Sequence, residues 1–112
     1  MYPYRMDYEI SVDQLKQLLT SDQPPVLLDV REQWEFDTAH IPNAVLMPMG
    51  DVPARAHQEL DEEQHVVVLC HHGARSLSVT AWLRNQGYDK AQSVAGGIDA
   101  WSRAIDPTVP LY

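Results

Sequence analysis

The chain has 112 residues, of which 45% are hydrophobic, enough for one domain with a single core. Its 16 acidic side chains outnumber the 8 basic ones, and a net charge of -8 disfavours binding to nucleic acids and to anionic membrane surfaces. We expect a single domain over residues 1–112, with a core over about 8–104 and a C-terminal tail over 105–112. The N-terminal stretch lacks the apolar run of a signal peptide and no window reaches the roughly 20 apolar residues of a membrane span, so we expect a cytoplasmic protein.

Elements in the first half of the chain alternate between extended and helical patterns. A short strand is expected over residues 8–10, and Ser11 with Gln14 has the spacing of a capping box at the start of a helix. Residues 26–30 form a short, nearly continuous apolar run, which is typical of a strand covered on both faces. The remaining predictions for this half are a loop or short helical turn over 31–38, a strand over 44–47 and a helix after Pro53.

The second half predicts two further strands, each followed by a helix. Residues 65–70 are rich in valine and give the clearest strand signal in the chain. A helix is expected over residues 74–86, ending at Gly87, and a last inner strand over 92–95. Five strands separated by helical segments imply an α/β fold with a mostly parallel sheet. Leu77, Ala81 and Trp82 are expected on one side of the helix over 74–86, with Val79 and Leu83 beside them. The other residues expected to pack are Trp34, Phe36 and Trp101.

The sequence CHHGARS, residues 70–76, holds the only cysteine of the chain. One cysteine excludes an internal disulfide and a Cys-x-x-Cys pair, so Cys70 is either an inert core thiol or a nucleophile. Its place directly after a strand favours the nucleophile, because ligands of parallel sheets bind beyond the carboxyl ends of the strands. The start of the next helix, a tight turn at Gly73 and the positive charge of Arg75 would together attract an anion and favour a thiolate.

Such a site suits covalent sulfur transfer. A thiolate at Cys70 could attack a sulfur atom bonded to an anionic group and hold it as a persulfide, stabilised by backbone amides, until an acceptor removes it. We expect no metal and no cofactor, because three consecutive residues, Cys70, His71 and His72, rarely converge on one ion and no carboxylate lies at ligand spacing. The two histidines are expected at the exposed rim, partly protonated near neutral pH.

A cysteine phosphatase or arsenate reductase is a competing enzyme class, since it also uses a strand, an anion-binding loop and an arginine. A phosphatase loop places five residues between cysteine and arginine to encircle a tetrahedral phosphate. Here only four residues separate Cys70 from Arg75. A smaller cradle favours a persulfide over a phosphoryl group.

At this point the motifs resemble those of a known family, the single-domain rhodaneses, which are sulfurtransferases. LLDVREQWEFDTAHIPNA resembles the family's Asp-x-Arg and His-Ile-Pro-Gly-Ala elements, CHHGARS resembles its six-residue active loop, and VAGGIDAW resembles its Gly-Gly-x-x-x-Trp segment. They follow one another in the family's order and span roughly residues 8–104. Asn43 replaces the usual glycine, and asparagine tolerates the left-handed backbone of such a turn.

The resemblance implies a rhodanese-like fold with a five-stranded, mostly parallel sheet flanked by helices. It also implies that Cys70 carries the persulfide, with Asp29 and Arg31 supporting the site. The residues expected to bind the substrate are His71, His72, Gly73, Ala74, Arg75 and Ser76.

The function implied is transfer of sulfane sulfur from thiosulfate or a persulfide donor to cyanide or a thiol. Thiosulfate specialists gather more basic residues at the loop than the pair His71 and His72, which points to a persulfide as the natural donor. The alternative is a sulfur carrier or protein-binding module without turnover, acting with a partner protein in a sulfur relay. The sequence carries no signal for the oligomeric state.

Overall fold

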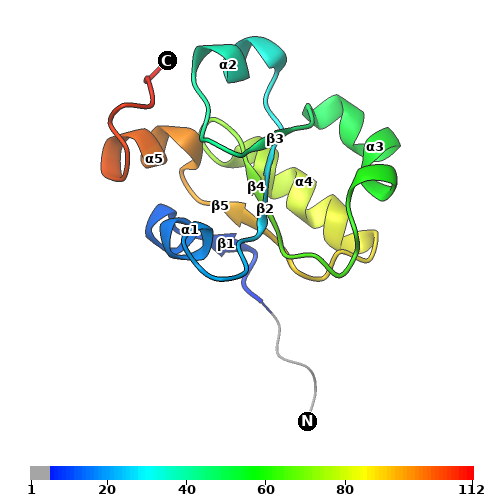
Figure 1. The fold of residues 1–112 in the computed structure, drawn as a ribbon. Coiled ribbons are helices and arrows are strands. Elements are labelled where there is room, and N and C mark those ends of the chain that lie inside the picture. Colours follow the sequence, from blue (N-terminus) through cyan, green and yellow to red (C-terminus); the bar gives the residue numbers. More distant parts are fainter. Residues whose placement is uncertain (1–5) are drawn as a thin grey trace.

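The computed structural model describes residues 6–112, and the first five residues of the stretch searched for a signal peptide lie outside the described residues. Five strands form one sheet in the order β1-β5-β4-β2-β3, and every neighbouring pair is parallel. This confirms the predicted α/β fold. The elements in chain order are β1 (Glu9–Ile10), α1 (Val12–Leu19), β2 (Val26–Asp29), α2 (Gln33–Thr38), β3 (Val45–Leu46), η1 (Met49–Asp51), α3 (Val52–Glu59), β4 (Val66–Leu69), α4 (Ala74–Asn85), β5 (Ala91–Val94) and α5 (Gly97–Ala104) (Figure 1).

The sheet is the middle of three layers, with α1 and α5 on one side and α3 and α4 on the other (Figure 1). Side chains of β4 alternate between the two faces: Val66 and Val68 pack in the cluster with α3 and α4, whereas Val67 and Leu69 pack in the cluster with α1 and α5. Because successive residues of a strand point to opposite faces, Cys70 continues the first set and joins the α4 side of the core. The alternation of side chains along β4 therefore places the thiol on the side of the sheet that α4 covers.

Local signals in the sequence account for several element boundaries. The Ser11 hydroxyl accepts a hydrogen bond from the backbone N–H of Gln14 at 3.1 Å and the Gln14 side chain accepts one from Ser11 N–H at 2.8 Å, so the predicted capping box is confirmed. Asn43 has φ of 70°, the left-handed conformation expected there. The third helix begins at Val52, slightly before the predicted start, with Pro53 in its first turn, where a missing N–H costs nothing.

The predicted apolar side of α4 was only partly right, since Val79 and Leu83 are buried but Leu77 and Ala81 are not, and the expected packing of Trp34 was wrong. Leu77 is 39% exposed, Ala81 is also exposed, and Trp34 is 62% exposed. Thr80 and Ser76 are buried on α4 instead, because their hydroxyl groups have hydrogen-bond partners inside the protein. Thr80 donates to the backbone carbonyl of Ser76 at 2.8 Å, and the Ser76 hydroxyl contacts the Gly73 carbonyl oxygen and the Ser93 hydroxyl. A hydrophobicity pattern places such residues on the outside and misses their internal partners. The buried residues of α4 are Ser76, Val79, Thr80 and Leu83.

Residues 105–112, predicted as a tail, pack back onto the domain. Val109 is 6% exposed and belongs to the core cluster on the α1 and α5 side. The chain then ends near α2, where the Tyr112 hydroxyl accepts a hydrogen bond from Arg31 at 2.9 Å (Figure 1). The end of the chain thereby becomes part of the site described below.

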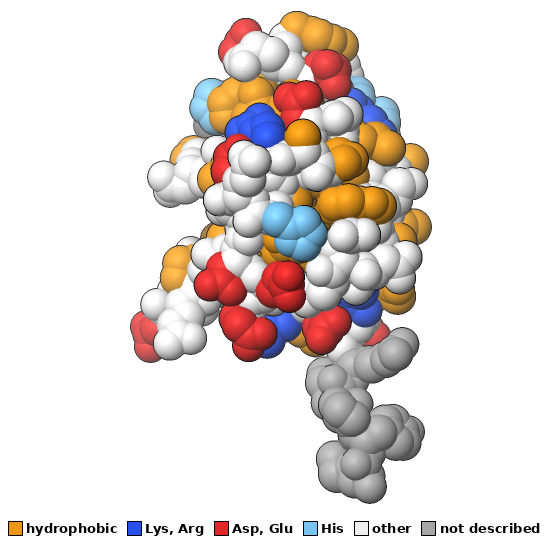
Figure 2. Space-filling model, turned by 90° about the vertical axis from the view of Figure 1, so that its right-hand side faces the viewer, with side chains coloured by type: hydrophobic (Ala, Val, Ile, Leu, Met, Phe, Trp, Pro, Cys, Tyr) orange, Lys and Arg blue, Asp and Glu red, His pale blue; other side chains and the backbone are white. Residues whose placement is uncertain are grey.

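The surface over α3 and α4 combines apolar and acidic areas. Figure 2 shows hydrophobic side chains gathered on this face and acidic side chains toward its lower edge. A shallow apolar hollow between the two helices is lined by Met49, Val52, Pro53, Ser78, Val79 and Trp82. Within residues 6–112, none of the helices is long and apolar enough to cross a membrane.

The amino-terminal end of α5 lies directly against the loop that follows β4. The backbone N–H of Ile98 donates to the carbonyl of Cys70 at 2.9 Å, and that of Asp99 donates to the carbonyl of His71 at 3.1 Å. Gly97 has φ of 59°, and a Cβ on it would lie 2.5 Å from the Cys70 carbonyl oxygen. Only glycine allows this approach, so Gly97 permits the hydrogen bonds that hold the loop to α5.

We expect Gly97→Ala to destabilise the protein by about 2 kcal/mol or more, because the backbone would be strained and the helix would have to move away from the loop. Gly50→Ala is the matched control, since a Cβ at Gly50 meets nothing within 4 Å. The measurement is urea denaturation of both variants and the parent. Equal stability of the two variants would contradict this account of the loop anchor.

Candidate active site

The thiol of Cys70 lies just past the carboxyl end of β4, at the start of the turn that leads into α4. Its side chain is 1% exposed, and its sulfur accepts hydrogen bonds from the backbone N–H groups of Gly73 at 3.1 Å and Ser76 at 3.3 Å. Gly73 has φ of 112° and precedes the first residue of α4. The left-handed turn therefore directs amides at the sulfur, and the free N–H groups of the first helical turn add positive potential.

Ser76 was predicted to bind substrate, but its side chain points inward and is fully buried. Its hydroxyl lies 3.3 Å from the Cys70 sulfur, 3.1 Å from the Gly73 carbonyl oxygen and 2.7 Å from the Ser93 hydroxyl. Through Ser76 these hydrogen bonds connect the turn to Ser93 of β5. Ser93 was not predicted as a site residue, because it is a small polar residue in a strand with no motif around it.

Arg75 lies on the rim of the loop, where it forms a two-point ion pair with Glu35 of α2. The two guanidinium nitrogens lie 2.7 and 2.9 Å from the two carboxylate oxygens. The hydrogen bonds from Arg75 lower the pKa of Glu35 to about 2, and those to Glu35 raise the pKa of Arg75. We expected the Arg75 charge to face the bound anion, whereas in the structure it faces a carboxylate.

The predicted support residues, Asp29 and Arg31, form a fully buried ion pair at the end of β2. Arg31 donates to both oxygens of Asp29, at 2.9 and 2.7 Å, and to the carbonyl of Ala39 at 2.7 Å and the carbonyl of Glu35 at 3.2 Å. Burial opposes the charged guanidinium, but its hydrogen bonds with Asp29 and Tyr112 outweigh that cost and raise the pKa of Arg31. The pair therefore holds the middle of α2, at Glu35, and the residue that follows it, Ala39.

Tyr112 joins the two ion pairs and covers part of the loop. Its hydroxyl accepts from Arg31 at 2.9 Å and donates to Glu35 at 2.8 Å, while its ring stacks on that of His71 with centroids 3.9 Å apart. Burial raises the pKa of Tyr112 to about 12, so the hydroxyl remains a donor at neutral pH. Neither Glu35 nor Tyr112 was found from the sequence, because their partners are distant along the chain.

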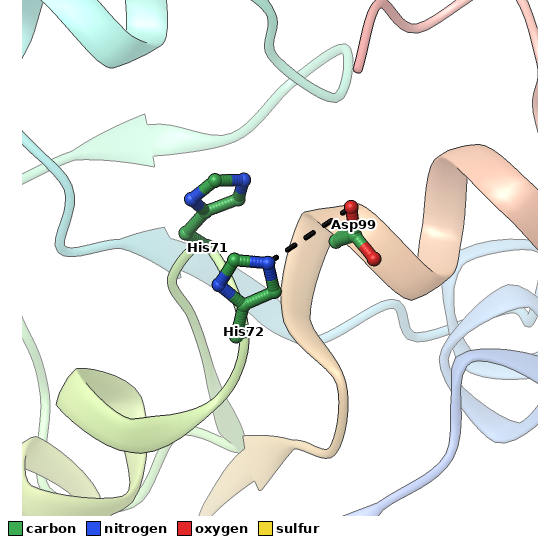
Figure 3. A group of neighbouring side chains, drawn as sticks. All are labelled: His71, His72 and Asp99. Carbon is green, nitrogen blue, oxygen red and sulfur yellow. Dashed lines mark ion pairs between the residues drawn. The ribbon is translucent and has the colours of Figure 1, made fainter. Parts of the chain in front are cut away.

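The two histidines after Cys70 differ in environment, although both were predicted to be exposed and partly protonated. His71 lies between the rings of His72 and Tyr112, and burial together with the nearby His72 lowers its pKa. His72 is exposed, with its Nε2 atom 4.0 Å from a carboxylate oxygen of Asp99 on α5 (Figure 3). Asp99 is the carboxylate that spacing along the sequence did not reveal.

The predicted site residues thus divide into those around the sulfur and those that hold the loop. Gly73 and Ser76 contact the Cys70 sulfur through their backbone amides, and Ala74 opens the helix beside them. Asp29 and Arg31 pair with each other, and Arg31 also bonds to Tyr112 beside the loop. The structure adds four side chains to this set: Glu35, Ser93, Asp99 and Tyr112.

Comparisons with known proteins place this geometry in a family. Residues 11–104 match the model of the rhodanese-like domain. A protein of Allochromatium vinosum named "Sulfurtransferase" is 37% identical over 101 residues, covering 90% of this chain and 94% of its own length. The crystal structure of a rhodanese-like domain protein from Staphylococcus aureus superposes with a TM-score of 0.81 at 31% identity, covering 95% of this chain and 99% of the other.

Other relatives are longer proteins. "Putative sulfur carrier protein YrkF" of Bacillus subtilis is 39% identical over 94 residues, which are 84% of this chain and 50% of YrkF. The chain spans between 26% and 50% of the length of three curated relatives, YrkF among them. The family match extends over most of the chain, from the capped first helix through the loop of Cys70 to α5, and the chain therefore belongs to the rhodanese-like domain family.

Proposed function

We propose that the protein is a sulfurtransferase that carries sulfane sulfur on Cys70 as a persulfide. The observation that carries this proposal is the convergence of two backbone N–H groups, from Gly73 and Ser76, on the Cys70 sulfur. Donors aimed at one sulfur atom at the start of a helix favour its anionic form. The names of relatives such as the Allochromatium vinosum sulfurtransferase support the same chemistry.

The reaction would proceed in two steps. In the first, the Cys70 thiolate attacks the outer sulfur of the donor, a new S–S bond forms, and the bond between that sulfur and the rest of the donor breaks. The leaving group, sulfite if the donor is thiosulfate, departs with the electron pair. In the second step a thiolate or cyanide attacks the outer sulfur of the persulfide, and the Cys70 thiolate is released.

The negative outer sulfur of the persulfide needs hydrogen-bond donors of its own. Ala74 and Arg75 occupy the first two positions of α4, where backbone N–H groups have no acceptor within the helix. We assign these amides to the outer sulfur, whereas the amides of Gly73 and Ser76 hold the inner one. Backbone amides suit this task because they are already oriented before the charge arrives.

The pairing of Arg75 bears on the choice of donor. Residues 70–76 contain one arginine, and its guanidinium is neutralised by Glu35. A doubly charged donor such as thiosulfate would approach a loop without an unpaired cation and with a carboxylate nearby. We therefore assign a persulfide of lower charge as the natural donor and a thiol as the natural acceptor.

The same ion pair disfavours the phosphatase alternative. A phosphatase arginine must donate hydrogen bonds from two guanidinium nitrogens to phosphate oxygens. In Arg75 the Nη1 and Nη2 atoms already donate to Glu35. The charge of Glu35 would also repel a phosphate dianion. The carrier alternative is different, because it uses the same persulfide on Cys70, and the printed name of YrkF supports it.

Incubation with a sulfane donor is expected to add one sulfur atom to the intact protein, and cyanide or a thiol should remove it. Because Cys70 is the only cysteine, Cys70→Ser should gain nothing, and this variant is the control. A low-molecular persulfide should load the protein faster than thiosulfate does. Intact-mass spectrometry measures the adduct, and its absence with every donor would refute the proposal.

Kinetics under multiple turnover separate the enzyme from the carrier. An enzyme releases product far in excess of its own concentration when donor and thiol acceptor are both abundant. A carrier yields one equivalent and then stops unless a partner protein is added. A single equivalent with all small acceptors would favour the carrier function.

Arg75→Ala is expected to destabilise the protein by about 1 to 3 kcal/mol at pH 7, because it leaves the buried Glu35 carboxylate without its main partner. The lowered pKa of Glu35, about 2, means that the pair stabilises the folded state above the ordinary pKa of 4.5 and that this stabilisation is lost as the pH falls toward 2. The difference between the variant and the parent should therefore be smaller at pH 3 than at pH 7. Urea denaturation at both pH values measures it.

Arg55→Ala is the matched control for this experiment. Arg55 also makes a two-point contact with a glutamate, but its partner Glu59 is 39% exposed on α3, whereas Glu35 is 5% exposed. Its loss should change stability little. If Arg75→Ala behaved like Arg55→Ala, the pair with Glu35 would not be holding the loop.

A further inference from the structure

Three side chains with metal-binding atoms meet beside the active loop. His71 and His72 follow Cys70, and Asp99 lies in the first turn of α5 (Figure 3). One ligand atom from each of these residues lies within 4.8 Å of the ligand atoms of the other two. The hydrogen bond from Asp99 N–H to the His71 carbonyl at 3.1 Å fixes the two backbone segments relative to each other.

The ligand atoms of this group are largely free of other partners. The Nε2 atom of His71 is buried and has no hydrogen-bond partner within the part of the chain that the structure describes. One carboxylate oxygen of Asp99 accepts from Arg103 at 3.0 Å, while the other faces the Nε2 atom of His72 at 4.0 Å, too long for a hydrogen bond.

We propose that His71, His72 and Asp99 bind a divalent transition metal ion of the zinc type. Two imidazoles and one carboxylate form a ligand set that zinc uses in sites with an open coordination position. The exposed side chain of His72 can rotate to close the remaining gap, since 66% of its surface is accessible. The contact between Arg103 and the second oxygen of Asp99 would orient the carboxylate from behind.

The site differs from a metal site built on the cysteine. Cys70, His71 and His72 are three consecutive residues, and such neighbours rarely converge on one ion. Here the third ligand comes from α5, which the parallel sheet and the Gly97 contact bring to the loop. Sulfur transfer at Cys70 and metal binding at this group are separate properties, and either can hold without the other.

The experiment titrates Zn²⁺ into the protein by isothermal titration calorimetry. Cys70→Ser serves as the background, because a free thiol binds zinc by itself, and the protein is prepared without a histidine tag for the same reason. We expect one ion per chain with a Kd on the order of micromolar or tighter. Asp99→Ala in this background should weaken binding at least about tenfold, as should His71→Ala.

His40→Ala is the matched control, since His40 is also exposed but lies beside Phe36, outside the group. Its affinity for Zn²⁺ should equal that of the background protein. Thermal melting followed by circular dichroism verifies that each variant is folded, and Asp99→Asn replaces Asp99→Ala if the latter is not. Absence of binding to folded Cys70→Ser, or equal affinity of the Asp99 and His40 variants, would overturn the proposal and leave His72 and Asp99 as a surface ion pair.

Discussion

The structure depends on the conformation of one turn, in which backbone amides point at the sulfur of Cys70. Left-handed Gly73 reverses the chain so that its own N–H and that of Ser76 face the thiol. A turn of this kind is not stable alone, because its carbonyl groups also need partners. The first N–H groups of α5 supply them at Cys70 and His71, and Gly97 permits the approach.

A second layer of interactions holds α2 and the end of the chain over this turn. Arg31 is fully buried together with Asp29. It donates hydrogen bonds to the Tyr112 hydroxyl, to the carbonyl of Glu35 in α2 and to that of Ala39 just after α2. Glu35 then joins Tyr112 to Arg75 of the loop. The charged side chains around the loop therefore hold its surroundings in place, whereas the proposed chemistry relies on neutral backbone donors. A site built from backbone N–H groups does not need an excess of basic side chains, and the protein as a whole has a net charge of -8.

The fold was largely predictable because its signals are local. A capping box at Ser11, the valine run of β4 and glycines at the turns each act over a few residues, and the alternation of strands with helices restricts the topology to few choices. The buried face of α4 was not predictable in the same way. Ser76 of α4 is buried because its hydroxyl meets that of Ser93 on β5, and no periodic pattern in the sequence shows this contact.

By itself, the sequence determined the position of the single cysteine, the loop length and the family, since these depend on the order and spacing of residues such as Cys70, Gly73 and Arg75. Only the tertiary structure decided what Arg75 faces, why Tyr112 matters and which carboxylate meets the two histidines. The physical reason is that hydrogen bonds and ion pairs depend on distance in space. In a parallel sheet, segments far apart along the chain, such as α2, the loop and α5, converge at the carboxyl ends of the strands.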